Sequence, residues 1–311
     1  MITILGAGSM GCLWAAHLSS LHTTQFVSTR NTTITEKEFS LTSLHHNSTH
    51  KYTIPIKTFK QITQPIKLLL VCTKSYDTYP ALIELKTKIS RETTIVLFQN
   101  GLGSQFEIIN EFPDNAILSA VTTEGVNSQL NGRIIHAGIG STNIGILNKP
   151  NKYAQSSQYL LDNCFNYLGK SKLVVEIQDN IWKFLWRKLA VNCAINPFTA
   201  IIDCPNGEIK QHDFFKLKWP SLKKELANLL TLENHPITEE ELEHIVFNVI
   251  KSSRNNISSM LQDIRNNKKT EINDINGFAA QRLKSKGEPG NINLEMWKRV
   301  SKLQDNYLSQ Y

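Results

Sequence analysis

One stretch near the start of the chain decides the fold class: Ile2-Thr3-Ile4-Leu5-Gly6-Ala7-Gly8-Ser9-Met10-Gly11. Its apolar first part is typical of a strand, the glycines have the G-x-G-x-x-G spacing, and Met10–Leu21 has helical spacing. In that context the glycines permit a tight turn, close approach of a pyrophosphate to backbone N–H groups, and close packing of helix on strand. We therefore expect a dinucleotide to bind Gly6, Ala7, Gly8, Ser9, Met10 and Gly11; an ordinary glycine-rich turn is the alternative.

Further apolar runs, separated by stretches with helical spacing, predict the other strands of this sheet: Gln25–Ser28, Leu68–Cys72, Thr94–Phe98 and Ile117–Thr122. Helices between consecutive strands indicate a parallel sheet, so the expected class is α/β with a Rossmann-type doubly wound sheet. Residues 31–64 are rich in Thr, Asn, Lys and His, and they predict polar turns with irregular or edge strands.

The pattern changes in the second half of the chain. Arg133–His136 and Asn143–Ile146 predict an antiparallel pair, and Leu173–Val175 predicts a last strand. From Asp179, the expected cap of a helix that starts at Ile181, long helices continue to the end. We therefore predict a Rossmann-type domain over residues 1–178 and an all-α domain over residues 179–311.

Composition narrows the class of protein. The net charge of +7 comes from Lys and Arg spread along all 311 residues without a dense cluster, which favours an anionic cofactor and substrate over nucleic acid. Five scattered cysteines and the lack of a signal peptide indicate a cytoplasmic protein, and the apolar runs are shorter than the roughly 20 residues of a membrane span. His45, His46 and His50 lack a clear fourth ligand, so no metal site is expected.

The predicted second strand indicates which dinucleotide binds. A site for NAD usually ends that strand with Asp or Glu, whereas Gln25–Ser28 leads into Thr29-Arg30-Asn31. Arg30 can form charge-assisted bonds to a 2′-phosphate, which favours NADPH; a solvated surface arginine is the alternative. Lys74 and Asn100 follow two other strands and are expected at the same edge of the sheet, with a solvated cap and a turn residue as the alternatives.

Polar residues recur every four positions in an otherwise apolar segment: Lys188, Asn192 and Asn196. On a helix they form one stripe, and burying an ammonium and two amides is costly unless partners await them. Asn256 and Ser259 begin a similar stripe with Asp263, at i, i+3 and i+7 of a second predicted helix. A ligand between the stripes and an internal polar network are the two explanations.

Ketone reduction needs a hydride donor and a group that protonates the developing alkoxide. A lysine in a water-poor cleft suits the second role, so Lys188 is the candidate general acid. Glu271, which begins a further predicted helix, can hold a substrate hydroxyl or orient Lys188; compensation of the helix dipole is the alternative. Amides and hydroxyls can bind carboxylate and hydroxyl oxygens without adding like charge, and the candidates are Asn192, Asn196, Asn256 and Ser259.

Taken together, these segments resemble the ketopantoate reductase family over almost the whole chain. The anchors are residues 6–11, Gln99-Asn100-Gly101-Leu102-Gly103, Leu185–Pro197, Asn256–Asp263 and Thr270-Glu271-Ile272. The resemblance implies an NADPH-binding domain joined to a helical substrate domain, and reduction of 2-dehydropantoate to (R)-pantoate in pantothenate and coenzyme A synthesis.

The resemblance also implies roles for individual residues. Lys188 matches the catalytic lysine, Glu271 the acid that engages the substrate hydroxyl, and Asn100 the partner of that lysine near the nicotinamide. The substrate-side residues it implies are Asn192, Asn196, Asn206, Asn256 and Ser259, and the cofactor contacts it implies are Arg30 and Lys74.

Two departures from the family pattern are visible. Leu21-His22-Thr23 replaces a glycine expected before the second strand, and a proline expected near Asn291-Ile292-Asn293 is absent, which puts the closure of that terminal segment in question. A reductase of another branched 2-oxo acid and a non-catalytic NADP sensor remain alternatives, and the expected assembly is a monomer or homodimer.

Overall fold

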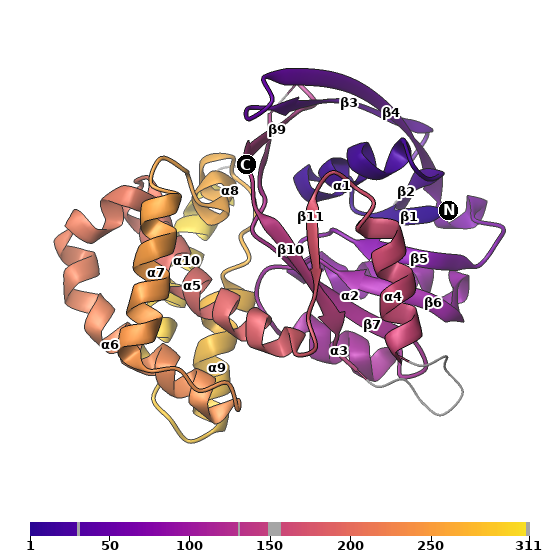
Figure 1. The fold of residues 1–311 in the computed structure, drawn as a ribbon. Helices are drawn as coiled ribbons and strands as arrows, with labels where there is room; N and C mark the ends of the chain where they lie inside the picture. Colours follow the sequence, from indigo (N-terminus) through magenta and orange to yellow (C-terminus); the bar gives the residue numbers. More distant parts are fainter. Residues whose placement is uncertain (30–31, 130, 149–156, 309–311) are drawn as a thin grey trace. The chain divides into compact units, whose positions relative to one another are not determined.

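The computed structural model describes residues 1–29, 32–129, 131–148 and 157–308. The chain forms two compact units (Figure 1). The amino-terminal unit comprises Met1–Gln99 and Ser104–Phe184, and the carboxy-terminal unit comprises Asn100–Gly103 and the chain from Leu185 onward. The short segment Asn100–Gly103 therefore packs with helices that come much later in the sequence.

An 11-stranded sheet forms the amino-terminal unit, in the order β11-β10-β7-β6-β5-β1-β2-β4-β3-β9-β8. Its strands are β1 (Ile2–Leu5), β2 (Thr24–Ser28), β3 (Glu36–Ser43), β4 (Ser48–Thr58), β5 (Ile66–Val71), β6 (Ile89–Leu97), β7 (Ala116–Thr122), β8 (Gly125–Ser128), β9 (Arg133–Gly138), β10 (Ser141–Ile146) and β11 (Val174–Ile177). The neighbours β7, β6, β5, β1 and β2 pair in parallel. This arrangement confirms the Rossmann-type class and the strands predicted within it.

Helix α1 lies inside a curl of this sheet, because β3, β4 and β9 arch over it (Figure 1). The helices of the unit are α1 (Ser9–Ser19), α2 (Ser75–Leu85), α3 (Ser104–Glu111) and α4 (Ser157–Leu168), with short 3-10 turns at Phe59–Gln61 and Lys86–Lys88. A helix covered on all sides must be apolar on all sides. Trp14 is accordingly fully buried, with its ring 5.4 Å from that of Phe98.

Two predictions for the sheet need correction. Residues 31–64 hold two long strands in the interior of the sheet order, since β3 pairs antiparallel with β4, and β4 pairs parallel with β2. Buried Phe39 and Leu41 and the β-branched threonines favour strand there despite the polar composition. The predicted antiparallel pairing of Arg133–His136 with Asn143–Ile146 is wrong, because β9 pairs with β3 and β8, whereas β10 pairs with β7 and β11.

The carboxy-terminal unit is all-α in the part that the structure describes, as predicted. Its elements are α5 (Ile181–Ile202, which begins in the amino-terminal unit), a 3-10 turn at Asn206–Gln211, α6 (Asp213–Leu232), α7 (Glu239–Ser252), α8 (Ser259–Arg265), a π-helix at Asn273–Gly277, α9 (Phe278–Ser285) and α10 (Asn291–Leu308). A row of packed aromatic rings, Phe198, Phe215, Trp219 and Phe247, joins α5, α6 and α7. These ring contacts pack α5 against α6 and α7 against α6.

The start of α5 also differs in detail from the prediction. The cap is Asn180 rather than Asp179, because Asn180 Oδ1 accepts a hydrogen bond from the Lys183 N–H at 3.3 Å. None of the helices in residues 1–29, 32–129, 131–148 and 157–308 combines the length and apolar character that a bilayer-spanning helix requires.

Candidate active site

The three glycines of the turn between β1 and α1 differ in how closely other atoms approach them. Gly6 has φ +102, and a Cβ there would lie 2.7 Å from the Thr73 nitrogen that follows β5. A Cβ at Gly11 would lie 2.0 Å from the Gly6 carbonyl oxygen. At Gly8, by contrast, a Cβ would meet no described atom within 4 Å. Packing therefore demands the first and third glycines, and the second faces open space.

The amino terminus of α1 suits an anion. Gly8 occupies the N-cap, and in the described residues no side chain caps the helix and no acidic residue lies in its first turn. Ser9 and Met10 are partly buried in that turn, and the exposed Ala7 precedes them. The first N–H groups of a helix attract negative charge. These residues fit the pyrophosphate of a dinucleotide.

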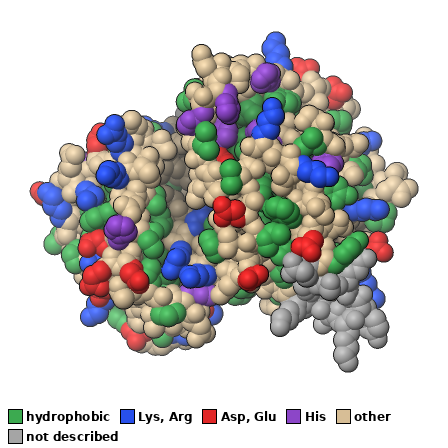
Figure 2. Space-filling view, in the orientation of Figure 1, with side chains coloured by type: hydrophobic (Ala, Val, Ile, Leu, Met, Phe, Trp, Pro, Cys, Tyr) green, Lys and Arg blue, Asp and Glu red, His purple; other side chains and the backbone are tan. Residues whose placement is uncertain are grey.

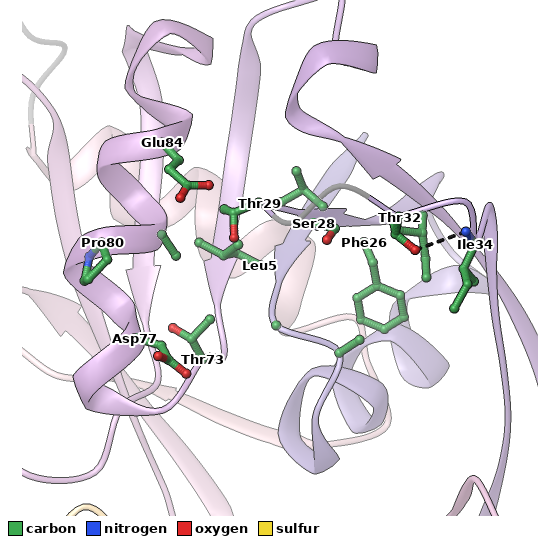
Figure 3. Close-up of a pocket in the computed structure, with 15 residues that line it drawn as sticks. Leu5, Phe26, Ser28, Thr29, Thr32, Ile34, Thr73, Asp77, Pro80 and Glu84 are labelled. Carbon is green, nitrogen blue, oxygen red and sulfur yellow. Dashed lines mark hydrogen bonds between the residues drawn. The ribbon is translucent and has the colours of Figure 1, made fainter. Parts of the chain in front are cut away.

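A cavity of about 620 Å³ opens beside the turn (Figure 3). Gly6, Ala7, Ser28 and Thr29 line it from the ends of β1 and β2, and Thr73 lines it from the end of β5. These strand ends are where a doubly wound sheet binds its ligand. Arg30, predicted to lie here, is outside the described residues.

Helix α2 forms the opposite wall of this cavity, which the sequence did not indicate. Asp77, Pro80, Ala81 and Glu84 line it, and Figure 3 shows Asp77 and Glu84 across the cavity from Ser28 and Thr29. The spacing i, i+3, i+4, i+7 places these four residues on one helical face. That periodicity, combined with the strand end before the helix, is the pattern that could have identified them.

Lys74 lies at the N-cap of α2, directly after Thr73. The Gln99 amide, which follows β6, donates to the carbonyls of Val71 at 2.8 Å and Thr73 at 3.2 Å. Thr78 Oγ1 donates to the Lys74 carbonyl at 2.9 Å. These bonds fix the backbone that carries Lys74.

A cluster of Asn100, Lys188 and Glu271 forms within the carboxy-terminal unit. Asn100 Nδ2 donates to Glu271 Oε2 at 3.2 Å, across 171 positions of sequence, and Glu271 is only 4% exposed. Burial lowers the pKa of Lys188 to about 8, and the negative charge of Glu271 opposes part of that effect. The structure thus brings together the three residues that were predicted to be catalytic.

Segment Asn100–Gly103 is held against the π-helix that follows Glu271. Leu102 N–H donates to the Asp274 carbonyl at 2.8 Å. Gly101 has φ +77, and a Cβ there would lie 2.3 Å from that same carbonyl oxygen. Only glycine permits this approach, so the loop after β6 delivers Asn100 to Glu271.

The structure distributes the predicted substrate residues over α5, the 3-10 turn that begins at Asn206, α8 and the segment before α8. Asn192 and Asn196 lie one and two turns beyond Lys188 on α5, with Asn196 buried and Asn192 partly buried. Asn206 is buried, its Nδ2 donates to Ser253 Oγ at 2.9 Å, and its N–H donates to the Asn256 carbonyl at 3.0 Å. The backbone therefore joins Asn206 to Asn256.

The predicted helical stripe through Asn256 is wrong, because α8 begins only at Ser259. Ser258, which the sequence did not indicate, caps that helix by accepting from Leu261 N–H at 3.1 Å. Its Oγ also lies 2.6 Å from Thr199 Oγ1 of α5. A serine at the N-cap ends the helical pattern there, and Asn256 belongs to the segment before it.

Histidines gather on the face of the amino-terminal unit over β3, β4 and β9 (Figure 2). The ring centroid of His136 lies 6.4 Å from that of His45 and 6.5 Å from that of His17, and His136 Nε2 lies 2.6 Å from Glu124 Oε2. Among the described residues, no three His, Cys, Asp or Glu side chains form a group able to hold a metal ion. His136 of β9 and Glu124, which lies between β7 and β8, form a buried pair.

The family models and the curated relatives that match this chain name the same family. The family model described as ketopantoate reductase PanE/ApbA matches residues 2–149, and the model for the C-terminal part of that family matches residues 180–303. The 2-dehydropantoate 2-reductase of Yersinia pestis is 31% identical and that of Shigella flexneri 32% identical, each over 98% of this chain and 96% of the relative.

Solved structures share the fold. A D-mandelate dehydrogenase with NADH and anilino(oxo)acetate superposes with a TM-score of 0.87 at 20% identity, covering 99% of both chains. A PanE/ApbA family ketopantoate reductase from Ralstonia eutropha JMP134 superposes with a TM-score of 0.83 at 21% identity, covering 100% of both chains.

Proposed function

The chain belongs to the ketopantoate reductase PanE/ApbA family, and from that premise we propose that it reduces 2-dehydropantoate to (R)-pantoate with NADPH in the cytoplasm, within pantothenate and coenzyme A synthesis. In this proposal the amino-terminal unit binds the cofactor and the carboxy-terminal unit binds the substrate. The observation that carries it is the cluster of Asn100, Lys188 and Glu271.

Lys188 is the proposed general acid. The nicotinamide, when bound, supplies a hydride to the keto carbon. The Lys188 ammonium donates a proton to the keto oxygen, which yields a secondary alcohol and leaves a neutral amine that solvent reprotonates. A pKa of about 8 suits this task, because the group is protonated at neutral pH and yet more acidic than an ordinary lysine.

Glu271 and Asn100 orient the reacting groups. The Glu271 carboxylate accepts from Asn100 and is charged near Lys188, so it can hold a substrate hydroxyl with its remaining lone pairs. Substrate oxygens would bind the neutral donors of the same unit: Asn192, Asn196, Asn206, Asn256 and Ser259. Neutral donors bind a carboxylate without adding another positive charge to lower the pKa of Lys188 further.

The glycine turn and the strand ends would hold the cofactor. Gly6, Ala7, Gly8, Ser9, Met10 and Gly11 would bind the pyrophosphate, and Lys74, Arg30 and Asn100 would contact the remainder. Preference for NADPH over NADH rests on Arg30 and on β2, which ends in the hydroxyl of Ser28 rather than a carboxylate. We expect Arg30→Ala to weaken NADPH binding about 10- to 100-fold with little effect on NADH. Equal preference for the two cofactors before and after this change would exclude the assignment.

The decisive experiment follows oxidation of NADPH or NADH by absorbance with 2-dehydropantoate and a panel of other 2-oxo acids, including phenylglyoxylate. Strong preference for 2-dehydropantoate with NADPH supports the proposal. Turnover of another 2-oxo acid alone would retain the chemistry and change the substrate. Binding of NADPH without turnover of any 2-oxo acid would indicate a sensor.

The proposed assembly is a monomer or a homodimer of this chain, with no nucleic acid or membrane partner. Light scattering of the purified protein distinguishes the two assemblies. A tetramer or larger species would contradict this part of the proposal.

A further inference from the structure

Helix α5 contains a proline, and this leaves one backbone carbonyl without its usual partner. Pro197 lies inside α5 and has no N–H. In an α-helix the N–H of residue 197 would donate to the carbonyl of Cys193, four residues earlier. Cys193 is fully buried, so water cannot replace the missing donor without entering the core.

Asn276 supplies that donor from another element. Its Nδ2 donates to the Cys193 carbonyl at 3.2 Å, and the same nitrogen donates to Asn293 Oδ1 at 3.0 Å. The side chain is 0% exposed. A single carboxamide therefore joins the middle of α5 to the π-helix in which Asn276 lies and to the first turn of α10.

The carboxamide is itself held in place. Glu225 of α6 accepts from the N–H of Asn293 at 3.0 Å, from Asn293 Nδ2 at 2.9 Å and from the N–H of Ile292 at 2.8 Å. Asn293 therefore offers its Oδ1 to Asn276 in one orientation. The chain of bonds runs from α6 through α10 and the π-helix to α5.

The π-helix links this network to Glu271. The Glu271 carbonyl accepts from the N–H groups of Asp274 and Ile275, both at 3.1 Å, and the Ile272 carbonyl accepts from Gly277 at 3.0 Å. Such wide turns occur often at functional sites. Helix α5 carries Lys188. Asn276 thus joins α5 to the helical turn that begins at the Glu271 carbonyl.

The buried position of Asn276 carries a cost in free energy. Its Oδ1 is buried and has no hydrogen-bond partner among the described residues. An apolar side chain of similar volume would avoid that unpaired oxygen but would leave the Cys193 carbonyl unpaired instead. With Asn276 in place, the Cys193 carbonyl has a donor and the π-helix stays bonded to α5.

We propose that Asn276 is a positioning residue: by bonding the Cys193 carbonyl that Pro197 leaves unpaired, it holds the Glu271 carboxylate beside the Lys188 ammonium. The inference deepens the proposed function and rests on it for its activity measurements. It assigns Asn276 no contact with substrate or cofactor.

The experiment compares Asn276→Leu with the double variant Asn276→Leu, Pro197→Ala. Alanine at 197 restores an N–H that can bond the Cys193 carbonyl within α5, which repairs the buried carbonyl but not the link to the π-helix. Asn115→Leu in the amino-terminal unit is the matched control, because Asn115 is a buried amide that donates to two backbone carbonyls, of Ser90 and Thr93.

Three measurements are made on each variant. Steady-state kinetics over a pH series give kcat, KM for NADPH, and the basic limb of the kcat profile. Separately, NMR of the protein with ¹³C-methylated lysines, assigned with Lys188→Arg, gives the pKa of Lys188 without substrate or cofactor. Thermal unfolding gives the melting temperature.

We expect Asn276→Leu to lower kcat about tenfold or more, leave KM for NADPH within about twofold, and move the Lys188 titration to lower pH by about half a unit or more, because a more distant Glu271 raises that pKa less. The double variant should recover the melting temperature but neither kcat nor the titration. Asn115→Leu should lower the melting temperature and leave the titration unchanged.

Other outcomes would overturn the inference. If the double variant regains kcat and the titration together with the melting temperature, Asn276 only satisfies a buried carbonyl. If Asn276→Leu leaves the Lys188 titration unchanged, Asn276 does not position Glu271. Absence of wild-type turnover on every 2-oxo acid would defeat the proposed function, whereas the NMR titration would still test Asn276.

Discussion

The glycine turn of the amino-terminal unit and the Lys188 cluster of the carboxy-terminal unit are built from different parts of the chain. The turn offers backbone N–H groups, and its geometry depends on the absence of side chains at Gly6 and Gly11. The cluster offers side chains, and Asn100 and Glu271 meet across 171 positions. A backbone site is encoded locally, whereas a side-chain site of this kind exists only after the chain has folded.

The largest expected effect is on the cluster. Lys188→Ala should lower kcat about 10³-fold, because the keto oxygen loses its proton donor. NADPH affinity should change less than about threefold, since the turn does not depend on Lys188. Steady-state kinetics and fluorescence titration with NADPH measure the two quantities. Lys183→Ala, at an exposed lysine of α5, is the control. If Lys188→Ala loses kcat and NADPH affinity to the same extent, the two sites do not have separate roles.

The next effect distinguishes two glycines of the turn. Gly11→Ala should lower the melting temperature and weaken NADPH binding about 100-fold, because its methyl group would lie 2.0 Å from the Gly6 carbonyl oxygen. Gly8→Ala should weaken NADPH binding about tenfold with little loss of stability, because its methyl group occupies only the space open to a ligand. Calorimetry with and without NADPH measures both. Identical behaviour of the two variants would show that the glycines have no distinct roles.

A smaller expected effect is a shift in the pH dependence of kcat. Lys188 must be protonated to act as an acid, so kcat should fall as pH rises through about 8. Glu271→Gln removes the charge that raises the pKa of Lys188, so the basic limb should move to lower pH by about one unit, beyond any loss in kcat itself. A pH series from neutral to alkaline conditions measures the limb. A limb that moves to higher pH would assign it to another group.

The smallest effect concerns His17, a partly buried histidine of the amino-terminal unit. Burial, reinforced by His136 and opposed by Glu124, lowers the pKa of His17 to about 4. Its unfolded value of 6.5 is higher, so the unfolded chain binds more protons between these pH values. The free energy of unfolding should therefore fall as pH drops from 6.5 toward 4.

His17→Gln should remove on the order of 1–3 kcal/mol of this acid sensitivity, because glutamine does not titrate. Urea denaturation at pH 7 and pH 5 measures the difference, with the exposed His50→Gln as the control. An unchanged difference between the two pH values in His17→Gln would exclude burial of a neutral His17.

The sequence predicted the positions of strands better than it predicted which strands pair with one another. The strands β1, β5 and β6 were identifiable because each is a short apolar run followed by a helix, and β2 and β7 because each is a short run that follows one. The partners of β9 and β10 were not, because two nearby strands with glycines between them can pair with each other or with distant strands. Hydrogen bonds in a sheet depend on register across the whole sheet, which no local window contains.

The same distinction applies within the helical unit. Lys188 was identifiable as a costly charge in an apolar segment and by family resemblance, and Glu271 was identifiable by family resemblance. Ser258 and Asn276 were not, because a serine cap and a buried amide have ordinary spacing in the sequence. Only the fold shows that Asn276 lies against the carbonyl that Pro197 leaves unpaired.

The sequence by itself determined the α/β class, the glycine turn after β1 and the change to helices, because apolar periodicity and glycine stereochemistry act over a few residues. Its resemblance to a known family identified the three clustered residues. Tertiary structure alone decided that Asn100–Gly103 joins the carboxy-terminal unit, that α2 walls the cavity, and that Asn276 bonds α5. Each of these depends on contacts between residues far apart in the chain, whose free energies are gained only when the whole unit packs.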